Sequence, residues 1–126
     1  MSRYDKYDGY AGGFRAPLNA DWAVADYGVP FGVGLNASGK VVKGAGATGV
    51  IGVLVVDGVV SGGVLKTEPK VAGDIVDVMT GGEIVETGQV AGTKFLADAV
   101  TGVLAATGTA VGYTVEAGRL VVRVAV

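Results

Sequence analysis

The chain has 126 residues, half of them apolar, with 23 glycines, ten basic and twelve acidic side chains, and a net charge of −2. It contains neither cysteine nor histidine, which excludes a disulfide scaffold, thiolate chemistry and the usual general base near neutral pH. The charges are spread thinly and form no basic patch, so we expect no nucleic-acid partner. Abundant glycine and β-branched residues disfavour long helices and are typical of many short strands joined by tight turns.

Residues 1–22 differ from the rest of the chain because large aromatic rings are concentrated there. Seven of the nine aromatic residues lie within the first 31 positions, and Tyr and Trp dominate contact energy at protein interfaces. We therefore predict an extended aromatic-rich N-terminal arm over residues 1–22 and a β-rich body over residues 23–126. The predicted contact residues of the arm are Tyr4, Tyr7, Tyr10, Phe14, Arg15 and Trp22. The alternative is that the arm folds back and covers one end of its own body.

The body is predicted to be a series of short strands around one central strand. Residues 50–56 hold four Val, one Ile, one Leu and one Gly, which favours a strand covered on both faces. Other predicted strands are residues 23–25, 30–35, 40–43, 74–79, 83–86, 94–97, 103–106, 111–115 and 119–126, and residues 80–82 turn the strand at 74–79 into the one at 83–86. The connection at 57–73 has room for a short strand at 59–60 or 64–65. The fold class is all-β, a small Gly- and Val-rich β-barrel or sandwich of short antiparallel strands with an extended N-terminal arm.

Alternation in the last strand predicts which side faces the core. Leu120, Val122, Val124 and Val126 share one face and are expected to be buried. If the preceding loop is only Ala117-Gly118, Glu116 lies opposite Arg119 as a cross-strand ion pair. A Gly bulge with the register shifted by one residue is the alternative, because Ala fits primed two-residue turns poorly.

Two motifs that suggest chemistry have simpler explanations. Residues 44–49 spell G-x-G-x-x-G, but a dinucleotide site needs that sequence to open a helix, and the residues that follow are β-branched. A connection between strands is expected instead. The carboxylate pairs Asp74/Asp77 and Glu83/Glu86 are three residues apart, so on a strand their members point to opposite faces and share neither a proton nor a metal. We expect no cofactor, no metal site and no enzyme activity.

Several segments resemble phage head decoration and capsid cement proteins. Residues 39–42, 46–54 and 77–85 are similar to the head decoration protein of phage lambda. Residues 92–98, 101–103, 111–118 and 121–124 are similar to small phage structural cement proteins. Together the similar segments extend over residues 28–126, and their order and spacing carry the resemblance. The lambda protein lacks the final hairpins, and the arm of this chain has its own sequence.

The resemblance implies a structural virion protein on the outer surface of an icosahedral phage capsid, assembled in the host cytoplasm. It implies a homotrimer at threefold or quasi-threefold positions that bridges major capsid subunits and stabilises the mature shell. The expected partners are the major capsid protein and further copies of this chain, with no nucleic acid and no membrane: the first eight residues are too polar for a secretory signal. An alternative of a different class is a displayed β-module that binds a carbohydrate or a host surface ligand.

Overall fold

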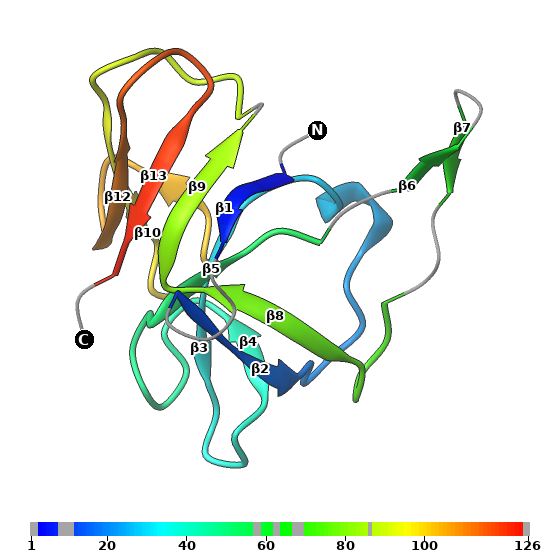
Figure 1. The fold of residues 1–126 in the computed structure, drawn as a ribbon. Coiled ribbons are helices and arrows are strands. Elements are labelled where there is room, and N and C mark those ends of the chain that lie inside the picture. The colour runs from blue at the N-terminus through cyan, green and yellow to red at the C-terminus, as the bar shows by residue number, and fades with distance from the viewer. Residues whose placement is uncertain are drawn as a thin grey trace.

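The structure, a computed structural model, describes residues 3–7, 12–56, 59–61, 64–66, 70–85 and 87–124. For residues 3, 5–7, 59–61 and 64–66 the description covers the backbone alone. The described residues form thirteen strands and one short 3-10 helix, η1 (Val24–Asp26). The strands pair antiparallel into a six-stranded sheet, a five-stranded sheet and one separate hairpin (Figure 1). The predicted all-β, sandwich-like fold of short antiparallel strands is confirmed.

Both sheets combine strands from distant parts of the chain. In spatial order, the six-stranded sheet contains β1 (Arg3–Tyr7), β9 (Gly81–Val85), β13 (Leu120–Arg123), β12 (Thr109–Thr114), β10 (Lys94–Ala97) and β11 (Leu104–Ala105). The five-stranded sheet contains β2 (Gly13–Pro17), β8 (Ile75–Met79), β5 (Gly52–Leu54), β3 (Phe31–Leu35) and β4 (Val41–Lys43). The hairpin contains β6 (Val59–Ser61) and β7 (Val64–Lys66).

The central strand predicted at residues 50–56 is confirmed. Its regular part, β5, occupies the middle of the five-stranded sheet. Successive side chains of a strand point to opposite faces, and this segment uses both: Leu54 and Val56 belong to one core, whereas Val53 and Val55 belong to another. The second core lies between the two sheets, because it also contains Ile84, Phe95 and Leu120, which belong to the six-stranded sheet.

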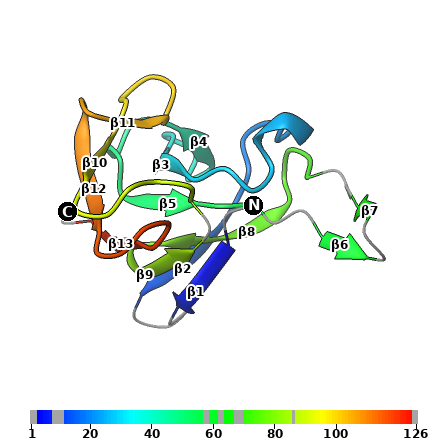
Figure 2. The same cartoon turned by 90° about the horizontal axis from the view of Figure 1, so that it is seen from above.

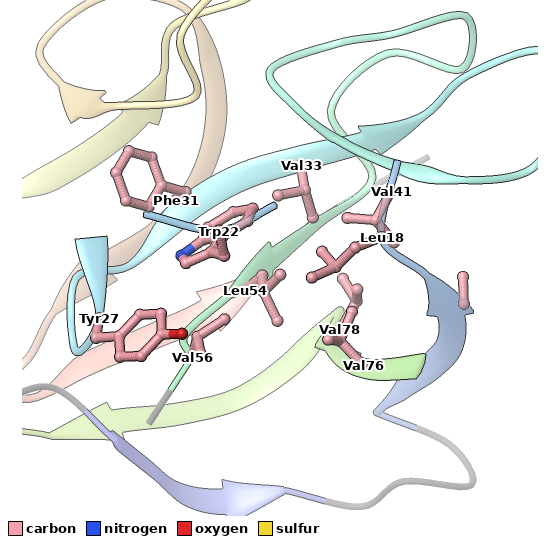
Figure 3. Packing of buried hydrophobic residues seen from close by; sticks show 11 residues of the cluster. Leu18, Trp22, Tyr27, Phe31, Val33, Val41, Leu54, Val56, Val76 and Val78 are labelled. Atoms are coloured by element: carbon pink, nitrogen blue, oxygen red, sulfur yellow. The ribbon is translucent and has the colours of Figure 1, made fainter. Parts of the chain in front are cut away.

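The first core lies on the outer side of the five-stranded sheet (Figure 3). The residues that the sheet contributes to this core are Val33, Val41, Leu54, Val76 and Val78. Residues 18–27 cover them with three large buried side chains, namely Leu18, Trp22 and Tyr27. The molecule is therefore layered as sheet, core, sheet, core and covering segment.

Gly32 lies where the two layers of strands approach each other closely. It lies on β3, and a Cβ atom added there would sit 2.2 Å from the Cβ of Ala97 on β10. Any larger residue at position 32 would therefore push the sheets apart. The glycine inside this strand has a packing reason and does not indicate a break in the strand.

The described part of residues 1–22, predicted as an extended arm, instead joins both sheets. β1 forms one edge of the six-stranded sheet beside β9, and β2 forms one edge of the five-stranded sheet beside β8. Trp22 lies in the first core. The edge strand of each sheet offers backbone hydrogen-bonding partners to the N-terminal segment, and a segment extended away from the sheets would lack them. For the described part of residues 1–22, the folded-back alternative is the one that the structure adopts.

Two local predictions along the body are also wrong. Residues 23–25 begin a 3-10 turn, with the Asp26 N–H donating to the Ala23 carbonyl at 2.9 Å, because the turn brings Trp22 and Tyr27 on either side of it into the same core. Residues 80–82 do not fold β9 back onto β8. The chain passes at Thr80 from the five-stranded to the six-stranded sheet, where β9 pairs with β1 and β13.

The C-terminal third follows its prediction closely. β10 pairs with β11, and β12 pairs with β13. Leu120 and Val122 are fully buried, Val124 packs against the second core, and Val126 lies outside the described residues.

The shifted register at the last turn is the one observed. The Val115 N–H donates to the Arg119 carbonyl, which leaves a three-residue loop, and Gly118 has a φ of 75°, as loops with a left-handed third residue require. Arg119 still contacts Glu116, with Nε 2.9 Å from the carboxylate, and it also lies 3.4 Å from Glu83.

The long connection at residues 57–73 contains both of its candidate strands. They pair with each other as β6 and β7, with Val60 opposite Leu65. Figure 1 and Figure 2 show this hairpin standing away from both sheets. Among the described residues, no helix has the length and apolar character needed to cross a membrane.

Candidate functional site

Tyr4 connects the two sheets of its own subunit. Its ring is half-buried against the second core. Its hydroxyl lies 2.9 Å from the Asp77 carbonyl and 3.3 Å from the Val53 carbonyl, and it accepts a hydrogen bond from the Val55 N–H at 3.2 Å. One hydroxyl proton serves one carbonyl at a time, and Asp77 offers the shorter contact. Tyr4 therefore ties β1 to β5 and β8.

Phe14 and Arg15 on β2 point to different environments. Phe14 packs against the first core as a half-buried ring. Arg15 is 69% exposed and its Nε lies 3.0 Å from the carboxylate of Asp77 on the neighbouring strand. An ion pair this exposed contributes little to stability. Among the predicted contact residues whose side chains the structure describes, Arg15 is the one that solvent reaches freely.

Trp22 is a core residue with only 6% of its surface exposed. Its ring meets Phe31 edge to face, with the centroids 5.5 Å apart. The Lys43 ammonium lies 4.6 Å from the centroid of Trp22 and 4.3 Å from that of Phe31, and it pairs with the Asp26 carboxylate. Cation–π and ionic contacts therefore fasten β4 and η1 over the first core.

The structure does not bring the six predicted contact residues onto one surface. Tyr4 belongs with the second core, whereas Phe14 and Trp22 belong with the first. Tyr10 and the side chain of Tyr7 lie outside the described residues. A contact between these residues and a neighbouring protein stays a prediction, and Trp22 is too deeply buried in this fold to make one.

The described carboxylates show no grouping typical of a metal site. Within the part of the chain that the structure describes, no three Asp or Glu side chains lie together as metal ligands would. Asp98 has a pKa below its usual value because its carboxylate accepts hydrogen bonds from the backbone N–H groups of Thr101 and Val100. These bonds close the tight loop between β10 and β11. The G-x-G-x-x-G segment likewise forms the turn between β4 and β5, as expected.

The outer side of the six-stranded sheet carries an exposed apolar surface, which we call the Tyr113 face. It consists of Tyr113 with its cross-strand neighbours Val121 and Lys94, and of Val115 two residues further along the same face. Tyr113 and Val115 are exposed, the latter to 61%. Tyr is enriched at protein interfaces because it offers a large ring at low entropic cost. This face is a candidate docking surface.

A second surface feature is an apolar hollow of about 300 Å³, which we call the hollow. Its lining residues are Gly28, Val29, Pro30, Phe31, Thr87, Gln89, Phe95, Val103, Leu104 and Leu120. They come from both sheets and from the connections at their ends. Val29 and Val103 are exposed, Val103 to 48%. Pockets for small molecules run from about 300 to 1,000 Å³, so the hollow suits one or two apolar side chains.

Comparison with known proteins identifies a similar fold. No protein-family model matches the chain, and no curated protein matches it. A solved structure from Mycobacterium phage Patience is similar, with a TM-score of 0.84 over 97% of this chain and 95% of that chain, at 21% sequence identity. The chain shares the fold of a mycobacteriophage protein. At this identity the likeness establishes the fold alone.

Neither the Tyr113 face nor the hollow is predicted from the sequence. Tyr113 lies on a predicted strand, but its outward side follows from its pairing with Val121, which lies between the buried residues Leu120 and Val122. The hollow combines residues from position 28 to position 120. The local sequence signal for these surfaces is a Val or Tyr next to a Gly-rich turn. That pattern recurs throughout this sequence and therefore does not single them out.

Proposed function

We propose that this protein is a structural virion protein that binds the outer surface of an icosahedral phage capsid. The observation that carries the proposal is its fold, which matches that of a mycobacteriophage protein over almost the full length of both chains. The resemblance of residues 28–126 to phage decoration and cement proteins supports the same role. In this role it binds as a homotrimer at threefold or quasi-threefold positions and bridges major capsid subunits.

The proposed mechanism is mechanical. Two cores on either side of one sheet make a compact body that transmits strain well, because close-packed interiors are poorly compressible. A partner that binds only the assembled shell stabilises it by mass action. Many copies on one shell, each engaging more than one capsid subunit, add avidity without requiring a strong single contact.

The Tyr113 face and Arg15 are the proposed capsid contacts. Tyr113, Val115 and Val121 provide apolar area, and Lys94 beside Tyr113 provides a cation. Arg15 lies on the exposed part of β2 and is retained from the predicted contact residues. Trp22 is not retained, because exposing it would open the first core.

The test is co-sedimentation with empty mature shells built from the major capsid protein of the same genome. We expect saturable binding at a fixed number of copies per capsid subunit, and a higher temperature of shell disruption when the protein is bound. Tyr113→Ser should weaken binding at least tenfold. The matched control, Val100→Ser, changes an exposed residue of the β10–β11 loop and should bind as the wild type does. Absence of any binding to mature shells at saturating protein contradicts the proposal.

The carbohydrate-binding alternative receives no support from the arrangement of the aromatic residues. Such sites use exposed rings beside polar groups on a rigid sheet, whereas Trp22 is buried and Phe14 and Tyr4 are half-buried. Among the described side chains, Tyr113 is the sole aromatic ring with an exposed face. Screening the purified protein on a glycan array tests this alternative directly.

A further inference from the structure

The β6–β7 hairpin is separate from the rest of the fold. Its two strands pair only with each other among the described strands, whereas every other described strand joins one of the two large sheets. Both views show it projecting from the body on the side opposite β10 and β11 (Figures 1 and 2). An isolated two-stranded hairpin is marginally stable at best in water.

The hairpin has the composition of a buried element. Its two strands contain Val59, Val60, Val64 and Leu65, with only Ser61 and Lys66 as polar residues. Val60 and Leu65 lie directly opposite each other in the register, and cross-strand partners share one face of a sheet. A pair of branched apolar residues on one face calls for an apolar surface to cover it.

The hollow is such a surface. Phe31, Phe95, Leu104 and Leu120 line it, with Val29 and Val103 at exposed positions. The strands β10 and β11, which supply Phe95 and Leu104, lie on the side of the body away from the hairpin (Figure 2). The hairpin and two of the strands that line the hollow thus lie on opposite sides of the chain.

We propose that the apolar β6–β7 hairpin of one copy docks onto the hollow of the next. This inference rests on the proposed homo-oligomer and names the surfaces that join its subunits. Because the two surfaces differ, the contact is head-to-tail. Head-to-tail contacts form a closed ring when the rotation between subunits closes, and a trimer closes after three such contacts.

The first test measures solution mass by light scattering for the full chain and three variants. The hairpin variant is Val60→Ser with Leu65→Ser, and the hollow variant is Val103→Lys. The control is Ile75→Lys, which places the same charge on an exposed apolar residue of β8, outside both the hollow and the Tyr113 face. We expect a trimer for the wild type and the control, and monomers for the other two variants. A hairpin variant that keeps the wild-type mass overturns the inference, as does a wild type that stays monomeric at every concentration.

Mixing supplies the sharper test. The hairpin variant keeps an intact hollow, and the hollow variant keeps an intact hairpin. An equimolar mixture should therefore form one-to-one dimers, although each variant alone is monomeric. A mixture that remains monomeric overturns the head-to-tail pairing. Unfolding temperatures near the wild-type value confirm that the variants are folded, and Val29→Lys, also exposed and lining the hollow, replaces Val103→Lys if that variant is unstable.

Shell binding separates this inference from the proposed function. If the wild type is monomeric in solution and still binds mature shells, the hairpin-in-hollow contact is wrong and the capsid role stands. If it forms the expected trimer through the hairpin but does not bind shells, the contact is right and the capsid role is wrong. If the hairpin binds the capsid protein instead of a second copy, the hairpin variant loses shell binding and the wild type remains monomeric in solution.

Discussion

The N-terminal segment and the β6–β7 hairpin differ from the predictions made from their sequences in opposite ways. The first carries the aromatic residues expected of a contact arm, yet its described strands complete the edges of both sheets. The second reads as part of a long connection, yet it forms a paired apolar element that stands apart from the body. Aromatic composition thus indicates that a segment buries surface against some partner. Whether that partner is the segment's own body depends on whether a sheet edge is free to pair with it.

The largest expected effect follows deletion of residues 2–15. This deletion removes β1, most of β2 and the Tyr4 hydroxyl that bridges the sheets. We expect the free energy of unfolding to fall by about 5 kcal/mol or more, which is comparable to the total stability of a small domain. Circular dichroism should then show no cooperative unfolding transition. Cutting residues 59–66 to a short Gly-Ser linker should leave the transition almost unchanged. A deletion of 2–15 that melts like the wild type shows that the segment is an arm after all.

Trp22→Ala tests the same contrast with a single side chain. Trp22 fills the first core against Phe31 and Lys43, so truncation should lower the free energy of unfolding by about 3–5 kcal/mol. Leu65→Ala in the hairpin, measured where the protein is monomeric, should cost less than about 0.5 kcal/mol. Urea titrations followed by far-UV circular dichroism give both values. Equal costs for the two substitutions contradict the layered packing.

A smaller effect is expected for Tyr4→Phe, which keeps the ring and removes the hydroxyl. The Val55 N–H and the Asp77 carbonyl lose a hydrogen-bonding partner, which should cost about 1 kcal/mol. Tyr113→Phe is the matched control, because Tyr113 is exposed, and it should be neutral. If both substitutions are neutral under urea denaturation, Tyr4 does not join the sheets.

The smallest effect concerns Asp98 and depends on pH. Hydrogen bonds from the Thr101 and Val100 N–H groups lower the pKa of Asp98 in the folded protein relative to its usual 3.8. A lowered folded pKa stabilises the fold above the unfolded pKa, and this contribution is lost as the pH falls through the folded pKa. The unfolding temperature of Asp98→Asn should therefore lie slightly below that of the wild type at pH 7, and the gap should close at strongly acidic pH. A gap that is independent of pH assigns the effect to something other than the carboxylate charge.

The sequence predicts elements with strong local signals and misses those decided by long-range pairing. The run at residues 50–56 identifies the central strand because both faces of a buried strand must be apolar. The alternation of Leu120 and Val122 identifies the buried side of the last strand in the same way. In contrast, no local pattern shows that β8 continues into the other sheet at Thr80, because that depends on which strands pair with β9.

The candidate surfaces were less accessible to sequence analysis than the fold. The aromatic residues near the N-terminus gave a clear compositional signal, but burial of Trp22 depends on residues 18–27 finding the open face of the five-stranded sheet. The hollow arises where the connections at 28–31 and 87–89 meet strands β10, β11 and β13. Neither arrangement can be inferred from residue spacing along the chain.

Backbone hydrogen–deuterium exchange at low and high protein concentration tests the contrast between the two regions most directly. At both concentrations, peptides covering residues 3–7 and 13–17 should exchange slowly, close to the rate of those covering β5. Peptides covering residues 59–66 should exchange quickly in the dilute monomer and become protected when copies associate. Fast exchange of the N-terminal peptides, together with a hairpin already protected in the monomer, would contradict the account.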